Sequence, residues 1–323
     1  MRTITLEEHF ATPKFMDGPG SELKERALKF GGRASKLLEQ LYDVGDKRIA
    51  EMDAARIDMQ ILSITSPGTE QLETAEAVAV ARETNDYLAE AMRSHPERFG
   101  GFAALPTADP EAAAAELERT IRDCGFKGAV INGHVNGRYL DDKFFWPIFE
   151  RAEALHAPIY LHPTPPPKPV IEASYSGFAP IVTEMFAGPG WGWHIETALH
   201  ALRIILGGTF DRYPGLQLVV GHMGETLPFM LQRVDMMPVA MTKLNRPISY
   251  YLRENIHYTF SGFNFTPAFL NLFLEVGVDR IMFSADYPYA SMVQARAFLD
   301  QLPVSTADRE RIAHGNAERL FGI

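Results

Sequence analysis

The chain has 323 residues, 46% of them hydrophobic and 22% charged, a globular composition that excludes the disordered and fibrous classes of protein. Its formal net charge of -10 argues against a nucleic-acid groove, because phosphate binding needs a cluster of Lys and Arg side chains and we find none. The single cysteine, Cys124, cannot form an internal disulfide, and no apolar run approaches the ~18 residues of a membrane span. We therefore expect a cytoplasmic protein without a nucleic-acid or membrane partner.

Short apolar segments alternate with segments of helical periodicity along the whole chain. The eight predicted strands are, in chain order, residues 3–7, 58–64, 99–105, 128–132, 158–162, 216–222, 255–260 and 280–284. Helices are predicted between them, one of them opening at Asp109-Pro110, where proline suits the first turn. This alternation indicates βαβ crossovers and a parallel sheet, and eight repeats close into a barrel. The predicted fold is an α/β (β/α)8 TIM barrel in which residues 1–323 form one domain.

Two long connections depart from the regular alternation. They are residues 11–46, after the first predicted strand, and residues 163–194, after the fifth. Both insertions are predicted to be loops that wall a pocket. No Gly-x-Gly-x-x-Gly run follows the first strand, so a dinucleotide-binding fold is not indicated.

Ligand-type side chains end several of the predicted strands, at the rim where TIM barrels hold their active sites. Glu7 and His9 end the first strand, and a spacing of two points both side chains to one face of a strand. His162 ends the fifth strand, His222 the sixth, and Asp286 follows the eighth. With Glu7 and His9, His162 and Asp286 make a mixed nitrogen and oxygen set suited to one divalent ion, zinc or manganese, with positions open for water or substrate.

Each of these residues also has a structural alternative. His162 could be a hydrogen-bonded core histidine, and Asp286 could cap a helix or form a turn before Tyr287-Pro288. Glu8, on the face opposite Glu7, is predicted to pair with a Lys or Arg behind the sheet. We favour the metal site, because four ligand-type residues ending three strands at one rim are hard to obtain by chance.

At these motifs the sequence resembles the amidohydrolase superfamily, in the branch of aminocarboxymuconate-semialdehyde decarboxylase and the hydroxybenzoate decarboxylases, and within it the gamma-resorcylate and 2,3-dihydroxybenzoate decarboxylases. The stretches that carry the resemblance are residues 6–10 (LEEHF), 102–106 (FAALP), 160–163 (YLHP), 221–225 (GHMGE) and 280–288 (RIMFSADYP). The segments 163–168 and 287–290 depart from the pattern of several relatives. Because both lie in substrate-facing loops, the particular acid stays open.

The resemblance implies the same four metal ligands, with His222 beside the substrate and Glu225 and Arg233 around them. It implies a metal-dependent, non-oxidative decarboxylase that takes a small aromatic acid with a hydroxyl ortho to its carboxylate. We predict that Asp286 protonates the ring carbon, that His222 polarises the hydroxyl, and that Glu225 fixes the tautomer of His222. Arg233 is either a substrate or interface cation or a solvated helix residue. In relatives an arginine often crosses a subunit interface, so a homodimer or homotetramer is implied.

Aromatic side chains could supply the wall of a pocket for the ring, although each is equally consistent with ordinary packing. The candidates are Phe10, Phe186, Trp191 and Tyr289. His134 and His194 could also touch the substrate, but a structural role is favoured for both.

Two rival functions remain. One is a metal-dependent hydrolase or hydratase of a small lactone, ester or amide, in which the metal ionises a water molecule. The other is a binding scaffold without catalysis, which four intact ligand-type residues argue against. Decarboxylation is favoured by the resemblance and by Asn132-Gly133-His134 at the end of the fourth strand, where no lysine is present to bridge a second metal.

Overall fold

Eight parallel strands pair in chain order, each with the next. A parallel bridge between Leu6 and Ser284 joins the first strand to the segment after the eighth and closes the sheet into a barrel. The strands are β1 (Ile4–Phe10), β2 (Met59–Ile64), β3 (Phe99–Ala104), β4 (Gly128–Asn132), β5 (Ile159–His162), β6 (Leu218–Val220), β7 (Ile256–Thr259) and β8 (Ile281–Met282). This computed structural model describes residues 1–30 and 32–323, with side chains at all of them except 26, 27, 30 and 33. The predicted TIM barrel is confirmed.

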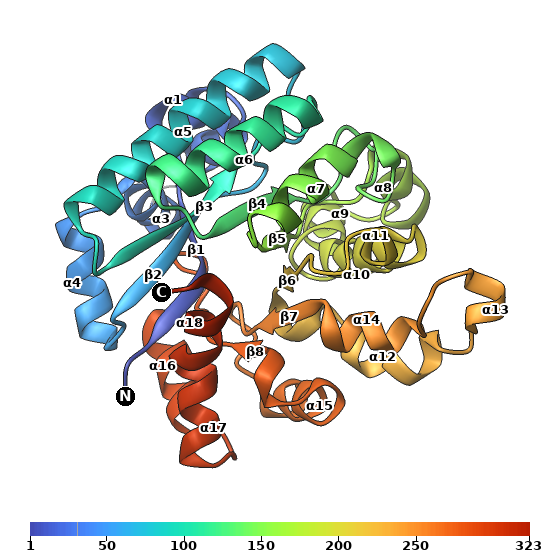
Figure 1. Cartoon of the computed structure of the whole chain (residues 1–323). Helices are drawn as coiled ribbons and strands as arrows, with labels where there is room; N and C mark the ends of the chain where they lie inside the picture. Colours follow the sequence, from blue (N-terminus) through green and yellow to red (C-terminus); the bar gives the residue numbers. More distant parts are fainter. Residues whose placement is uncertain (31) are drawn as a thin grey trace.

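Helices form the outer layer of the barrel (Figure 1). Those that first follow β2, β3, β4, β6, β7 and β8 are α5 (Thr74–Ser94), α6 (Pro110–Cys124), α7 (Trp146–Ala154), α12 (Leu227–Val234), α15 (Thr266–Val276) and α16 (Met292–Asp300). The others outside the two insertions are α4 (Asp46–Ala55), α10 (Gly192–Leu206), α11 (Thr209–Arg212), α13 (Val239–Thr242), α14 (Ile248–Glu254), α17 (Thr306–Glu310) and α18 (Asn316–Phe321). Four short 3-10 or π turns are η1 (Lys143–Phe145), η2 (His222–Gly224), η3 (Val278–Arg280) and η4 (Arg311–Gly315). Among the described residues, no helix combines the length and apolar character needed to cross a membrane.

The predicted start of α6 is confirmed and shows how the local sequence sets an element boundary. The carboxylate of Asp109 accepts a hydrogen bond from the backbone N–H of Ala112, and Pro110 occupies the first turn. Gly125 ends the helix with a φ of 75°, a conformation that costs glycine little. The helix is therefore delimited at both ends by residues next to it in sequence.

The strands are buried along their whole length, and β3 packs especially closely. A Cβ atom at Gly100 would lie 2.6 Å from Ile61, and one at Gly101 would lie 2.8 Å from Leu88 of α5. The Gly- and Ala-rich composition of this strand thus lets the barrel wall and its covering helix approach each other. In this fold the active site forms at the C-terminal ends of the strands, where the polar side chains lie.

The two insertions are mostly helical, so the prediction that they are loops was wrong. The first contains α1 (Pro13–Asp17), α2 (Ser21–Phe30) and α3 (Gly32–Tyr42), and the second contains α8 (Lys168–Ser174) and α9 (Pro180–Ala187). Thr12 caps α1 by accepting a hydrogen bond from Phe15 N–H, and prolines occupy the first turns of α1, α8 and α9. These prolines are helix-start signals, whereas the prediction treated the segments as irregular.

Candidate active site and metal centre

Glu7, His9 and His162 converge at the C-terminal rim of the barrel. One ligand atom of each lies within 4.8 Å of the others. Oε1 of Glu7 is 3.3 Å from Nε2 of His162, and Nε2 of His9 is 3.3 Å from Oδ1 of Asp286. The first three side chains are buried, whereas 18% of the Asp286 side chain is exposed. The structure therefore brings together the four residues that the sequence nominates as metal ligands.

Several buried ligand-type atoms of these residues have no hydrogen-bond partner among the described residues. Oε1 of Glu7, both ring nitrogens of His9 and Nδ1 of His162 are buried without a hydrogen bond to any described residue. A buried polar atom left unpaired costs about 1–3 kcal/mol. Burial, and then the neighbouring His9 and His222, hold the pKa of His162 well below its usual range, so the ring is neutral, as metal binding requires. These residues fit one divalent ion held by carboxylate and imidazole ligands.

The backbone at Glu7 differs from the regular strand assumed from the sequence. The pairing of β1 with β2 shifts register between Thr5 and Glu8, and Glu7 has a φ of 62°. Strict alternation therefore does not explain why Glu7 and His9 both face the barrel interior; a bulge in β1 redirects Glu7 instead. Its second oxygen, Oε2, accepts hydrogen bonds from the hydroxyls of Tyr160 and Ser261.

Positive φ values concentrate at this rim. Of the eleven non-glycine residues with positive φ in the described chain, seven are Glu7, His222, Met223, Glu225, Thr226, Ser261 and Asp286. Each such residue costs of the order of 1–2 kcal/mol relative to ordinary backbone, and strain of this kind gathers at functional sites. The turn after β6 alone contains five successive residues with left-handed backbone, because Gly224 is among them.

His222 and His194 share one carboxylate. Oε1 of Glu225 lies 2.6 Å from Nδ1 of His222, and its Oε2 lies 2.6 Å from Nδ1 of His194. Burial alone would lower the pKa of His222, but the carboxylates of Glu225 and Glu7 outweigh it and raise that pKa to about 10. Nε2 of His222 points toward the cluster and is 3.8 Å from Oε1 of Glu7. The structure therefore pairs His222 with Glu225 and adds His194, for which the sequence favours a structural role, to the same carboxylate.

Glu8 holds the segment that carries Asp286. Its carboxylate accepts hydrogen bonds from the backbone N–H groups of Ala285 and Tyr287, the two neighbours of Asp286, at 2.8 and 3.2 Å. Among the described residues no basic side chain forms the direct ion pair with Glu8 that the sequence predicted; backbone donors and the amide of Gln60 bond its carboxylate, and the buried Arg48 acts on it through its charge alone. Burial raises the pKa of Glu8 well above its usual range. The residue fixes one predicted ligand relative to the strand that carries two others.

Comparison with known proteins agrees with this geometry. A family model described as amidohydrolase matches residues 35–323. The chain belongs to the amidohydrolase family. It is 38% identical to the gamma-resorcylate decarboxylase of a Polaromonas species, over 99% of this chain and 98% of that one. The predicted resemblance to the decarboxylases of this family is confirmed.

Two solved decarboxylases superpose on almost the whole chain of this amidohydrolase. The dihydroxybenzoic acid decarboxylase of a Polaromonas species, with manganese and the inhibitor 2-nitroresorcinol, has a TM-score of 0.86, 37% identity and coverage of 99% of this chain and 97% of that one. The 5-carboxyvanillate decarboxylase of Novosphingobium aromaticivorans, with manganese and 4-hydroxy-3-methoxy-5-nitrobenzoic acid, has a TM-score of 0.92, 36% identity and coverage of 100% and 96%. Both relatives therefore hold a metal and an aromatic ligand on the same fold.

The predicted aromatic residues are distributed differently around the amidohydrolase site. Tyr289 lies beside the cluster, with its ring centroid 5.4 Å from that of His9 and its hydroxyl 2.5 Å from that of Thr65. Phe10 is buried in the core, where its ring stacks on Tyr87 of α5 at 6.2 Å. Packing therefore accounts for Phe10, whereas Tyr289 is positioned to line the site.

Three further predicted residues lie at the surface of the chain. Phe186 and Trp191 belong to the insertion after β5 and are exposed. Arg233 is exposed on α12, where its guanidinium lies 2.7 Å from the sulfur of Met236. No described contact joins Arg233 to the metal cluster within this chain. A ring that the sequence did not single out, Phe263, stands edge-on to His222 at 5.3 Å.

Asn132 lies at the site, although the sequence analysis gave it no role there. It is the register partner of His162 across β4 and β5, and register partners in a parallel sheet point to the same face. Its side chain is fully buried. Glu70 accepts the backbone N–H of Asn132 at 3.0 Å, and burial raises the pKa of Glu70 to about 7. Asn132 therefore places a buried amide beside Glu70, whose pKa its side chain lowers, and next to the metal ligand His162.

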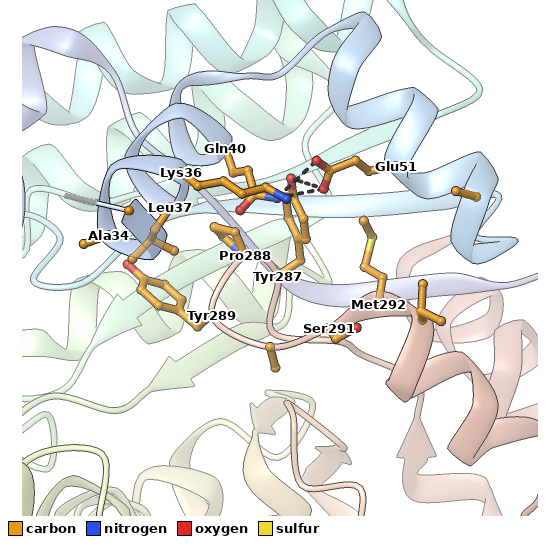
Figure 2. A pocket seen from close by; sticks show the side chains of 14 residues that line it. Ala34, Lys36, Leu37, Gln40, Glu51, Tyr287, Pro288, Tyr289, Ser291 and Met292 are labelled. Atoms are coloured by element: carbon orange, nitrogen blue, oxygen red, sulfur yellow. Dashed lines mark hydrogen bonds between the residues drawn. The ribbon is translucent and has the colours of Figure 1, made fainter. Parts of the chain in front are cut away.

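A cavity of about 940 Å³ adjoins this rim between α3, α4 and residues 287–293 (Figure 2). Tyr289, which contacts His9, is one of its lining residues. On the other side of the cavity Glu51 accepts hydrogen bonds from the hydroxyl of Tyr287 at 2.9 Å and from Gln40. The helical insertion after β1 therefore walls a hollow whose described lining includes Tyr289 but none of the four cluster residues. Glu51 braces the segment that carries Asp286.

Proposed function

We propose that this amidohydrolase is a metal-dependent, non-oxidative decarboxylase of aromatic acids that carry a hydroxyl ortho to the carboxylate. The observation that carries the proposal is the set of buried, unpartnered ligand atoms on Glu7, His9 and His162 in a chain that matches hydroxybenzoate decarboxylases from end to end. A hydroxyl and a carboxylate on adjacent ring carbons form a chelating pair, which is the ligand chemistry that such a site accepts.

Four residues would hold the ion: Glu7, His9, His162 and Asp286. When bound, the ion supplies positive charge that orients the two substrate oxygens and stabilises negative charge on them. Manganese in the structural relatives supports Mn²⁺ as the native metal of this chain, with Zn²⁺ as the alternative that the same donor set accepts.

The residues around the ion have different roles in the reaction. We assign the proton that reaches the ring carbon bearing the carboxylate to Asp286, which is partly exposed and lies 3.3 Å from His9. The carbon–carbon bond then breaks, its electron pair returns to the ring, and carbon dioxide leaves as the ring regains aromaticity. His222 faces the ring hydroxyl through Nε2, and Glu225 holds its Nδ1 proton. A general acid positioned in this way contributes about 10²–10⁴ in rate.

The surroundings of the cluster suit a flat, hydroxylated ring. The ring of Tyr289 packs edge-on against His9, and the ring of Phe263 packs edge-on against His222. We assign the buried amide of Asn132, next to His162, as the partner of a second hydroxyl on the ring. We therefore propose a dihydroxybenzoate as the preferred substrate.

A direct test is a substrate panel given to the manganese-loaded protein. The panel contains 2-hydroxybenzoate, 2,3- and 2,6-dihydroxybenzoate, and aromatic lactones and esters, all in water enriched with heavy oxygen. The proposal predicts carbon dioxide and the corresponding phenol in equal amounts from at least one acid. Heavy oxygen in the product without evolved gas would instead identify a hydrolase.

The proposal also includes a cytoplasmic homodimer or homotetramer built from one barrel domain of residues 1–323. Arg233 shares α12 with Phe229, which is 78% exposed, and the turn after that helix carries Met236, which is 64% exposed. A cation among exposed apolar side chains is typical of a protein interface. Sedimentation of the wild type and of Arg233→Ala tests this part, with a monomeric wild type as the contrary result.

A further inference from the structure

The two oxygens of Glu7 have different surroundings. Within the described part of the chain Oε1 has no hydrogen-bond partner and faces the histidines of the cluster, whereas Oε2 accepts from both Tyr160 and Ser261. We propose that Tyr160 and Ser261 are positioning residues that hold Glu7 as a one-oxygen metal ligand and so keep a coordination position open for the substrate. This inference rests on the proposed function in one respect only, the need for two open positions.

The hydroxyl network behind Glu7 allows Tyr160 and Ser261 both to donate to its carboxylate. The backbone N–H of Ser261 donates to Oγ of Ser284 at 2.6 Å, and the hydroxyl of Ser284 lies 3.1 Å from that of Ser261. The hydroxyl of Thr259 is 2.6 Å from that of Tyr160. If Ser284 and Thr259 donate inward, both remaining protons, on Ser261 and Tyr160, point at Glu7. The two donors are therefore fixed by neighbours on β7 and the segment after β8.

The backbone also confines this oxygen. A Cβ atom at Gly221 would lie 2.5 Å from Oε2 of Glu7, 2.9 Å from Oγ of Ser261 and 3.1 Å from the hydroxyl of Tyr160. Gly221 has an ordinary φ of -77°, so the requirement for glycine there is space and not backbone conformation. The carboxylate is thus enclosed on the side away from the cluster, and rotation would cost it two hydrogen bonds.

The coordination number of the metal explains why Glu7 should bind it through one oxygen. Manganese(II) prefers roughly six oxygen or nitrogen ligands in octahedral geometry. Four protein residues that bind through one atom each leave two positions, which match the carboxylate and hydroxyl oxygens of an ortho-hydroxy acid. If Glu7 bound through both oxygens, one position would remain and the acid could no longer chelate. Tyr160 and Ser261 therefore act on substrate binding through Glu7, without touching the substrate.

The test uses Tyr160→Phe, Ser261→Ala and the double variant, each loaded with Mn²⁺ and free of substrate. Tyr258→Phe is the matched control, since it removes a buried tyrosine hydroxyl that bonds Leu252 on the same barrel and not Glu7. Broadening of the manganese EPR lines in water enriched in oxygen-17 counts the water ligands. We expect two waters in the wild type and the control, and one in the double variant. An unchanged count in the double variant would overturn the proposal.

Kinetics supply an independent readout. Changes around a metal ligand commonly alter metal affinity or activity by about 10–100-fold, and here we expect KM for the acid to rise at least tenfold in the double variant. A fall in kcat at unchanged KM would contradict the positioning role. The water count needs no turnover, so it stands even if no acid is decarboxylated. In that case the proposed function fails, and the inference about Glu7 is judged by the EPR result alone.

Discussion

Replacing Glu225 with glutamine probes the pairing of His222 with a carboxylate. In the wild type Glu225 accepts from Nδ1 of His222 and from Nδ1 of His194, each at 2.6 Å. A glutamine side chain has one acceptor oxygen and presents an N–H₂ group to the other imidazole. One of the two histidines must therefore lose its partner or change its tautomer.

The size of the effect follows from that lost bond. A hydrogen bond to a charged group contributes about 1.5–3 kcal/mol. If the whole amount is lost in the transition state, kcat falls by about 10–150-fold, since ~1.4 kcal/mol corresponds to a factor of ten. Metal binding should change little, because Glu225 is not among the four proposed ligands and its carboxylate faces the two histidines.

The assay is steady-state decarboxylation by Glu225→Gln, with the manganese content of each preparation measured in parallel. Glu196→Gln is the matched control, because Glu196 is also a buried glutamate but lies on α10 beside Tyr139. The reasoning is refuted if Glu225→Gln keeps more than half of the wild-type kcat, or if its loss of activity simply follows a loss of manganese.

Three further predictions concern the acid, the substrate wall and stability. Asp286→Asn should lower kcat by about 10²–10⁴ while part of the manganese is retained on the other three ligands, and an active variant would remove Asp286 as the proton donor. Asn132→Leu should reduce the preference for 2,6-dihydroxybenzoate over 2-hydroxybenzoate by about tenfold, the value of one hydrogen bond, and an unchanged ratio of kcat/KM would exclude the proposed contact. Burial, and then His134 and Arg203, lower the pKa of His200 to about 3. Because the unfolded chain binds a proton at this residue more readily, the neutral His200 ring costs the folded state nothing above pH 6.5, and the free energy of unfolding decreases as the pH falls from 6.5 toward 3. Between pH 7.5 and 5 the wild type should lose ~2 kcal/mol more of unfolding free energy than His200→Gln, as measured by urea denaturation at the two pH values.

The barrel and the ligand cluster were predictable because both depend on short-range patterns. Segments with strand periodicity that alternate with segments of helical periodicity predict the fold. The parallel strands of a closed barrel all end at the same rim. Residues such as His162 and Asp286 are therefore neighbours in space wherever their strands end, although 124 positions separate them. The side-chain type and the strand end were sufficient to nominate them.

Other parts of the site could not be read in this way. His194 lies in the first turn of α10, and only the fold of the turn after β6 brings Glu225 to it. The bulge at Glu7 likewise depends on tertiary contacts, since its carboxylate binds hydroxyls from β5 and the segment after β7. Asn132 gave a partial signal, as a polar residue at a strand end, but its place beside Glu70 and His162 depends on how β4 pairs with β5.

The proposed function requires one divalent ion, held by Glu7, His9, His162 and Asp286, for loss of carbon dioxide from an ortho-hydroxy aromatic acid. Its most direct measurement is the evolution of carbon dioxide by chelator-treated protein as Mn²⁺ is added back in known amounts. We expect no gas from the treated protein and a linear rise in its rate of evolution that ends at about one ion per chain. Full activity in the chelated protein with its metal content verified as negligible would contradict it.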